Sequence, residues 1–294
     1  MTQRRSVWPH LGLPYLLLLP QVLITLVFFV WPALQAIRLS VYQQDPLGLA
    51  ELYVGLENFR AILGDPGWLA MLGRTIVLAV SVTAIAMSVG LVLAVMVDRT
   101  ARLAVAYTAV LVVPYAVAPA VAGALFLFLF APGVGLVAWV LGQAGIGWNP
   151  RLDGSQAMTL VILASAWKQI AYNFLFYLAG LQSIPKALLD AAAIDGASRA
   201  QAFWRITLPL LSPTTFFLLV VNLVYALFDT FGVIHAVTQG GPGKATEVMI
   251  YRAWYDGFIA TDLGRSAAQS VILMALVILL TVVQFRYIER RVHY

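Results

Sequence analysis

The sequence predicts an all-α integral membrane protein with six transmembrane helices, and composition, segment length and charge placement support this class. Of the 294 residues, 62% are hydrophobic and 11% are charged, far from the composition of soluble domains. Membrane lipid must therefore surround much of the chain. Six segments contain the roughly 20 apolar residues that a spanning helix needs. They are residues 11–37, 69–97, 104–130, 157–183, 211–236 and 266–288. We expect a single membrane domain over residues 1–294.

The first segment, residues 11–37, is too long for a signal peptide and has no small-residue cleavage site. It contains Pro14, Pro20 and Pro32. We therefore expect a retained helix. The run "GLENFRAIL" follows on the outer side, and its periodicity predicts a short amphipathic helix at the membrane surface. Its apolar face consists of Leu56, Phe59, Ile62 and Leu63.

Prolines and glycines mark the later connections. Pro114 and Pro119 predict a kink in segment 104–130. The glycine-rich loop 131–156 is too short for a folded domain, and "TQGGPGKAT" in loop 237–265 predicts a tight turn. Segments 157–183 and 211–236 are joined by residues 184–210, which are too charged to span a bilayer.

Charge predicts the orientation in the membrane. Ten Lys or Arg residues lie at the termini, the 98–103 turn and the 184–210 loop, against seven on the opposite side. Four acids lie on the first side and eight on the other, so the net charges are near +6 and −1. The side richer in Lys and Arg is usually cytoplasmic. We therefore expect a cytoplasmic membrane, with both termini and the 184–210 loop in the cytoplasm.

Several function classes have no support in the sequence. There are no cysteines, and His10, His235 and His293 lie far apart, so no metal site is expected. No nucleotide-binding loop, nucleophile elbow or pair of catalytic carboxylates occurs. The basic residues are scattered beside the spans, which argues against nucleic acid. We expect a protein that is not an enzyme, holds no cofactor and obtains its energy from another chain.

The 184–210 loop predicts a helical hairpin. Residues 186–194 favour helix, and Ala187, Ala191 and Ile194 share one face of it. Asp195 and Gly196 break this helix, and Asp195 is positioned to cap a second helix at about 197–207. Pro209 and Pro213 are expected to end the second helix. Such a hairpin combines a docking face with firm attachment to two spans.

The stretch "DAAAIDGASRAQAFWRITLPLLSP" resembles the signature loop of the membrane subunits of binding-protein-dependent ABC importers. The family has Glu where this chain has Asp190, which keeps the charge; Pro213 also matches. The resemblance implies that the hairpin is the coupling helix, which docks on an ATPase subunit. The implied coupling residues are Asp190, Ala191, Ala192, Asp195, Gly196, Ala197, Phe203, Ile206, Leu208 and Pro209.

The rest of the chain is similar to the carbohydrate-type permeases of this family, as in "FFVWPALQAIRLSVY", "YVGLENFRAIL" and "TQGGPGKAT". More narrowly, "VPYAVAPAVA" and "FFLLVVNLVYALFDTFGVIHAVTQGGP" resemble the family's permeases for sn-glycerol 3-phosphate. The resemblance implies a type I, maltose-permease-like fold and transport by alternating access. It also implies a second permease subunit in a heterodimer, two cytoplasmic ATP-binding subunits and an extracytoplasmic solute-binding protein.

Other functions stay open at this point. Glycerophosphodiesters are further candidate substrates, and a permease for a neutral sugar or polyol is the main alternative. An ion-coupled secondary transporter would predict inverted repeats, and a membrane-embedded lipid enzyme would need paired acids or a histidine cluster. The sequence shows neither feature.

Ionisable and polar residues within the spans are the candidates for the substrate path, because such residues are costly in lipid. Asn222, Tyr225 and Asp229 share one face of the fifth span. Lys168 and Asp229 could instead brace the helices, by pairing with each other or with backbone carbonyls, and at Asp229 this alternative is favoured because an acid repels an anionic substrate. The six candidates are Tyr115, Lys168, Asn173, Asn222, Tyr225 and Asp229.

Overall fold

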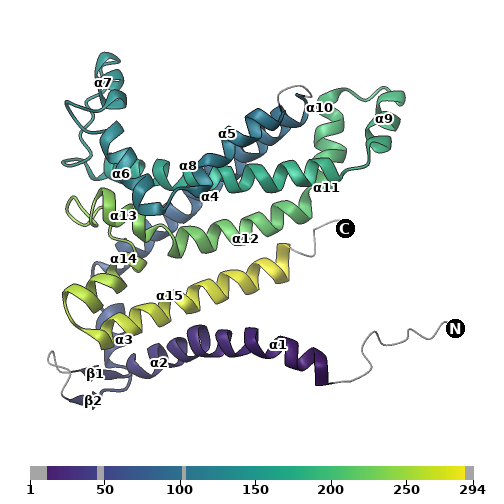
Figure 1. Cartoon of the computed structure of the whole chain (residues 1–294). Helices are drawn as coiled ribbons and strands as arrows, with labels where there is room; N and C mark the ends of the chain where they lie inside the picture. Colours follow the sequence, from purple (N-terminus) through teal and green to yellow (C-terminus); the bar gives the residue numbers. More distant parts are fainter. Residues whose placement is uncertain (1–11, 45–49, 101–103, 289–294) are drawn as a thin grey trace. The chain divides into compact units, whose positions relative to one another are not determined.

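The computed structural model describes residues 12–44, 50–100 and 104–288, which are mostly helical (Figure 1). The first elements are α1 (Gly12–Thr25), η1 (Leu26–Val30), α2 (Trp31–Leu39), β1 (Tyr42–Gln44), β2 (Glu51–Tyr53), α3 (Glu57–Leu63) and α4 (Trp68–Asp98). The middle elements are α5 (Ala104–Ala116), α6 (Pro119–Leu129), α7 (Leu136–Gln143), α8 (Gly154–Ser183) and α9 (Lys186–Ile194). The last are α10 (Arg199–Ala202), η2 (Phe203–Thr207), α11 (Leu208–Leu210), α12 (Ser212–Phe228), α13 (Phe231–Val237), α14 (Met249–Trp254), η3 (Tyr255–Ile259), α15 (Leu263–Val283) and η4 (Gln284–Ile288).

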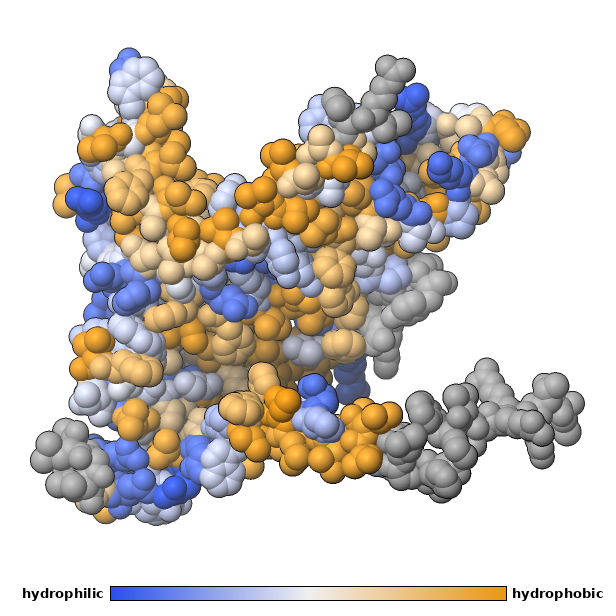
Figure 2. Space-filling view, viewed as in Figure 1, coloured by the Kyte–Doolittle hydropathy of each residue, from blue (hydrophilic) through white to orange (hydrophobic). Residues whose placement is uncertain are grey.

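The chain forms two compact units, residues 1–64 with 253–272 and residues 65–252 with 273–294. In the first unit, α1, η1 and α2 form one apolar helix from Tyr15 to Leu39. Its surface is mainly hydrophobic in Figure 2 (orange), and none of its described side chains is buried. This matches the apolar helix predicted over residues 11–37.

The same unit contains a small β-hairpin that the sequence did not predict. Strands β1 and β2 are antiparallel, with Tyr42 opposite Tyr53. The Asn58 amide on α3 donates to the carbonyls of Ser40 and Tyr42, both at 3.0 Å. Helix α3 coincides with the helix predicted from "GLENFRAIL"; of the predicted apolar face Ile62 is buried, whereas Leu56 and Leu63 are exposed.

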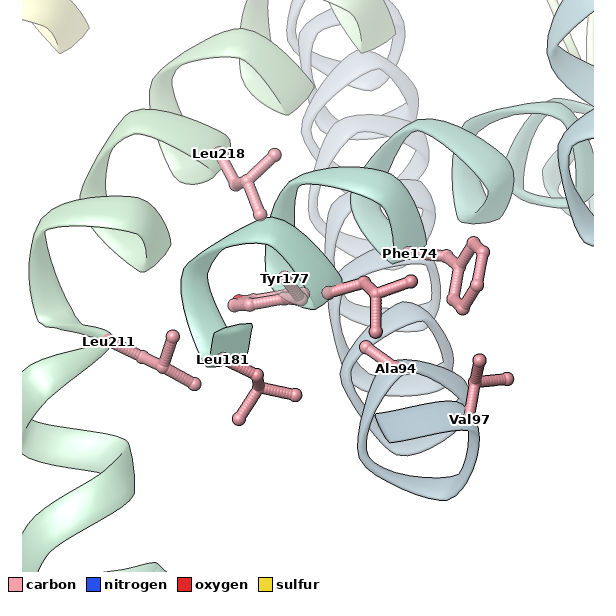
Figure 3. Packing of buried hydrophobic residues seen from close by; sticks show 8 residues of the cluster. Ala94, Val97, Phe174, Tyr177, Leu181, Leu211 and Leu218 are labelled. Atoms are coloured by element: carbon pink, nitrogen blue, oxygen red, sulfur yellow. The ribbon is translucent and has the colours of Figure 1, made fainter. Parts of the chain in front are cut away.

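The second unit is built around α4 and α8, which cross at Gly90. A Cβ atom at Gly90 would lie 2.6 Å from the Asn173 Cβ and 3.0 Å from the Phe174 backbone nitrogen. Small residues let membrane helices pack this closely. On the C-terminal side of this crossing in both helices, α4 and α8 share a hydrophobic core with the start of α12 (Figure 3). Its residues are Ala94, Val97, Phe174, Tyr177, Leu178, Leu181, Leu211 and Leu218.

The structure refines the predicted spans in three places. Three single helices of the described part are long and apolar enough to cross a membrane, Tyr15–Leu39, Trp68–Asp98 and Leu263–Arg286. The predicted segment 104–130 is not one helix, because α5 and α6 meet at 101°. The predicted segment 211–236 is divided into α12 and α13 at Asp229 and Thr230. Helix α8 has 30 residues but is not apolar enough to meet the same test.

Proline chemistry explains the α5–α6 bend. Pro119 is the first residue of α6, and the preceding Ala118 is extended, with φ −62° and ψ 144°. Helix α6 then packs on α13, where glycines allow close approach. A Cβ atom at Gly123 would lie 3.0 Å from the Ala236 Cβ, and one at Gly232 would lie 3.1 Å from the Pro119 Cβ. The predicted kink is confirmed, and it is a sharp turn.

Candidate functional site

The hairpin of residues 184–210 turns at Gly196, which has a φ of +80°. The Gly196 amide donates to the carbonyl of Ala193 at 3.1 Å. The Ala197 amide donates to the carbonyl of Ala192 at 2.9 Å. These two bonds form a Schellman motif, in which the left-handed residue after the helix is usually glycine. The Asp195–Gly196 pair therefore ends α9 by a defined backbone geometry.

The second helix begins at a capping box rather than at Asp195. The Ser198 hydroxyl accepts from the Gln201 amide (3.3 Å), and the Ser198 amide donates to the Gln201 side chain (2.8 Å). The prediction that Asp195 caps this helix is wrong. Ser198 and Gln201 satisfy two terminal amides reciprocally, and Asp195 is the C-cap of α9. The turn between the two helices is thus fixed on both sides.

The second helix also starts and ends a few residues later than predicted. It runs from Arg199 to Leu210 through the π-helical turn η2, and it meets α12 at 64°. The prediction that Pro209 ends this helix is wrong: Pro209 stands in the first turn of α11, where proline is tolerated, and the break falls at Leu211. The Leu211 side chain is buried in the core that contains Leu181 at the end of α8. Both ends of the hairpin are therefore joined to one hydrophobic core (Figure 3).

The hairpin exposes the predicted docking face. Ala187, Ala191 and Ile194 are exposed, and Ile194 is 86% accessible. Ala192 is buried on the opposite side of α9. Hydrophilic residues gather around the hairpin at the upper right of Figure 2. The remaining signature residues fall into two groups. Asp190, Asp195 and Gly196 are exposed, and Ala197, Phe203, Ile206, Leu208 and Pro209 are half-buried.

A second candidate region surrounds Lys168 in α8. The backbone carbonyl of Tyr115 would accept from residue 119 in an unbroken helix, but Pro119 has no N–H. The Lys168 ammonium donates to this carbonyl at 3.4 Å and lies 5.6 Å from the centre of the Tyr115 ring. Lys168 is half-buried. It therefore supplies the donor that the α5–α6 bend removes.

Aromatic rings continue from Lys168 along α8. Tyr172 and Phe176 follow at intervals of four residues, which places them on the same face as Lys168. Ring centres are 5.8 Å apart for Tyr115–Tyr172, 4.6 Å for Tyr172–Phe176 and 5.2 Å for Phe176–Phe217. These four residues, named the aromatic stripe below, are half-buried or exposed. Only Tyr115 was a sequence candidate, although the i, i+4, i+8 spacing was a usable signal.

The buried face of α8 carries an amide pair with α12. The Asn173 amide donates to the Asn222 side-chain oxygen at 2.9 Å, and the Asn222 amide donates to that of Asn173 at 2.8 Å. Each amide also donates to a carbonyl of its own helix, Gln169 or Leu218. Both side chains have 0% exposure. The pair therefore joins two helices and has no face open to a solute in this chain.

The remaining two candidates, Tyr225 and Asp229, differ in burial. The Tyr225 hydroxyl is buried against α8 and donates to the Ser165 carbonyl at 3.3 Å. Asp229 is exposed at the end of α12. No direct ion pair joins Asp229 and Lys168 in the described part of the chain. The structure thus brings Tyr115 and Lys168 together and places Asn173, Asn222 and Tyr225 between helices.

The N-terminus of helix α8 is capped by Asp153. The Asp153 carboxylate accepts from the Ser155 hydroxyl (2.7 Å) and from the amides of Ser155 (2.8 Å) and Gln156 (3.2 Å). These hydrogen bonds lower the pKa of Asp153, and the bond from the Ser155 hydroxyl has the largest effect. Among residues 12–44, 50–100 and 104–288, no cluster of three or more His, Cys, Asp or Glu could hold a metal ion.

Comparisons with known proteins agree on one family. A family model described as "Binding-protein-dependent transport system inner membrane component" matches residues 86–294. The sn-glycerol-3-phosphate transport system permease protein UgpA of Brucella abortus is 56% identical over 291 residues, 99% of each chain. UgpA of Agrobacterium fabrum is 55% identical over 98% of each chain, and UgpA of Pectobacterium atrosepticum is 52% identical over 100%.

Solved structures show the same fold at low sequence identity. A bacterial ABC transporter that imports the acidic polysaccharide alginate matches with a TM-score of 0.81 and 21% identity, over 95% of this chain and 96% of that one. A bacterial alginate ABC transporter in complex with its pentasaccharide-bound periplasmic protein matches with a TM-score of 0.80, also at 21% identity, over 93% of this chain and 92% of that chain.

Proposed function

The chain belongs to the family of binding-protein-dependent transport system inner membrane components, and we propose on this premise that it is the permease subunit of an ATP-driven importer for sn-glycerol 3-phosphate. Identity of 52–56% to UgpA proteins over nearly the whole chain carries the substrate assignment. The chain is a transport subunit and not an enzyme, as its family indicates. It is a multi-pass protein of the inner membrane.

Its partners follow from this assignment. A second permease subunit completes the pore, two ATP-binding subunits provide the energy, and an extracytoplasmic binding protein delivers the solute. The hairpin and both termini lie in the cytoplasm, in agreement with the excess of Lys and Arg on that side. The single domain expected over residues 1–294 is then one functional permease unit, although its contacts divide into two compact parts.

The hairpin transmits the movement of the ATPase subunits. Its exposed face, with Ala187, Ala191 and Ile194, is the docking surface. The Schellman turn and the capping box hold its two helices at a fixed geometry. Leu211 and Leu181 connect it to α12 and α8 in one core. A displacement of the docked hairpin is therefore passed to the spans and switches the pore between inward- and outward-facing states.

The aromatic stripe lines the translocation path where the second permease subunit completes it. Tyr115 and Tyr172 offer hydroxyl groups for the glycerol part of the substrate. Lys168 holds the α5–α6 bend at the head of the stripe through its bond to the Tyr115 carbonyl. Asn173, Asn222 and Tyr225 support the path as links between α8 and α12. A neutral sugar or polyol is the second candidate substrate, because Asp229 is exposed and an acid disfavours an anion.

Transport by the reconstituted importer tests this function. The chain is produced with its second permease, ATPase and binding-protein partners, and uptake of labelled sn-glycerol 3-phosphate is compared with that of glycerol 2-phosphate and maltose. We expect ATP-dependent uptake of sn-glycerol 3-phosphate and none by the isolated chain. Uptake of maltose in preference to sn-glycerol 3-phosphate would contradict the substrate assignment. ATP hydrolysis by the isolated chain would contradict its role as a transport subunit.

A further inference from the structure

An apolar groove of about 630 Å³ lies between the second half of α4 and the α10–η2 helix. Its walls include Val92 and Met96 of α4 and Phe203 and Trp204 of η2. Val92, Met96 and Trp204 are 57%, 60% and 67% exposed, so the described parts of this chain leave the groove open. The volume lies in the range of roughly 300–1,000 Å³ that is typical of small-molecule sites.

The two sides of α4 differ in a way that indicates what fills the groove. The side packed on α8 carries small residues, among them Ala86, Gly90 and Ala94, which suit close helix packing. The groove side carries the larger Val92 and Met96. Flexible and branched apolar side chains of this size are suited to lipid chains, and they keep another backbone at a distance. The groove side of α4 therefore has the character of a lipid-facing surface.

Positive charge marks one part of the groove. Arg99, just after α4, and Arg199, the first residue of α10, both line it and are exposed. Neither makes an ion pair with the described residues. Asp98 lines an adjacent cavity of about 260 Å³ together with both arginines. Trp204 adds a ring of the type that prefers the headgroup level of a bilayer.

We propose that this groove binds an anionic phospholipid, with an acyl chain along Val92, Met96 and Trp204 and the headgroup phosphate on Arg99 and Arg199. Arginine pairs a planar donor fork with phosphate oxygens. Basic residues beside apolar helices attract anionic headgroups in membranes. The site is separate from the aromatic stripe and does not depend on which solute is transported.

Quenching of Trp204 by brominated lipid tests the proposal on the assembled importer. The complex is placed in phosphatidylcholine vesicles that contain a small fraction of either brominated phosphatidylglycerol or brominated phosphatidylcholine. The difference between the native chain and Trp204→Phe gives the Trp204 signal. We expect much stronger quenching by brominated phosphatidylglycerol. Arg99→Gln and Arg199→Gln should each lower this preference about fivefold. Lys186→Gln is the matched control, since Lys186 is an exposed basic residue of the same hairpin outside the groove.

Asp98→Asn is a second variant that keeps both arginines and removes the adjacent acid, so it should raise the preference for the anionic lipid. Equal quenching by the two brominated lipids would show a nonspecific lipid surface and overturn the headgroup site. Absence of quenching by either lipid would show that the second permease subunit covers the groove, which also overturns the proposal. The proposal would also be overturned if Asp98→Asn, Arg99→Gln and Arg199→Gln, each tested singly, all left the preference for the anionic lipid unchanged.

Discussion

Lys168 lies where the bend between α5 and α6 meets the aromatic stripe. Pro119 cannot donate to the Tyr115 carbonyl, and the Lys168 ammonium takes the place of the missing N–H. A cation also suits the negative end of a helix, here the C-terminus of α5. The lysine is thus held by the scaffold, and its charge lies beside the aromatic stripe. The competing roles of this residue can be separated by experiment.

We predict that Lys168→Met lowers the yield of assembled importer, because the Tyr115 carbonyl loses its donor. The bond is solvent-accessible in this chain, so its loss should cost about 0.5–1.5 kcal/mol, the contribution of an ordinary hydrogen bond. Lys168→Arg keeps a donor and should retain most of the yield. Yield is measured by pull-down from detergent, and uptake is measured over a series of phosphorylated and neutral substrates. In the complexes that do assemble, all substrates should be affected equally. Normal yield with selective loss of sn-glycerol 3-phosphate uptake would instead assign Lys168 to phosphate recognition.

Gly196 gives a second test at the level of one residue. Its φ of +80° is the same as that of Gly133, and an added Cβ would meet no atom within 4 Å at either position. Substitution by alanine should therefore destabilise the folded protein by a similar amount, about 1 kcal/mol, at both positions. We predict that Gly196→Ala weakens ATP-driven uptake and Gly196→Val abolishes it, while membrane insertion is unchanged. Gly133→Ala, outside the hairpin, should leave uptake near normal. Equal effects of the two alanine variants would show that the hairpin turn has no special role in coupling.

At the scale of elements, local signals predicted most of the fold. The hairpin, α3 and the kink at Pro119 were visible because glycine, proline and a 3.6-residue period act over a few neighbours. The capping residue was assigned wrongly because Asp195 and Ser198 both favour caps, and only the backbone geometry distinguishes them. The 101° angle between α5 and α6 was not predictable, since it depends on the packing of Gly123 and Gly232 between α6 and α13.

The aromatic stripe shows what sequence reasoning could not reach. Its rings come from α5, α8 and α12, and their contacts exist only after those helices have packed. Asn173 and Asn222 show the opposite case. Each looks like a path residue in its own helix, because a polar side chain within a span is rare. Their reciprocal bonds across α8 and α12 become visible only in three dimensions.

The amide pair provides a prediction about the α8–α12 interface. Asn222→Leu leaves the Asn173 amide partly unsatisfied at 0% exposure and should destabilise the assembled protein by about 1–3 kcal/mol. Replacing both residues by leucine should recover part of this loss, because no buried polar group then lacks a partner. Val224→Leu on the exposed side of α12 is the control and should change little. Thermal unfolding in detergent gives the comparison. Simple addition of the two single-variant losses would show that the residues act independently.

At the scale of the whole molecule, α8 connects the two ends of the second unit. Its 30 residues extend about 45 Å at 1.5 Å per residue, and the hydrocarbon core of a bilayer is about 30 Å thick. The helix is long enough to cross, although its polar residues keep it below the apolarity of the other spans. Those polar residues face α12, the Tyr115 carbonyl and the proposed path. A helix that is shielded by its neighbours does not need an apolar surface all around.

The crossing of α8 leads to a prediction about orientation. Leu152, just before α8, is 81% exposed, and Ile194, at the end of α9, is 86% exposed. The chain has no cysteines, so Leu152→Cys and Ile194→Cys each introduce a single thiol. In cells with a permeable outer membrane and an intact inner membrane, a membrane-impermeant maleimide should label Leu152→Cys at once. Ile194→Cys should be labelled only after the inner membrane is opened, because the hairpin is proposed to be cytoplasmic. Labelling of both thiols, or of Ile194→Cys alone, in intact cells would contradict the proposed orientation and, with it, the docking of the hairpin on a cytoplasmic ATPase.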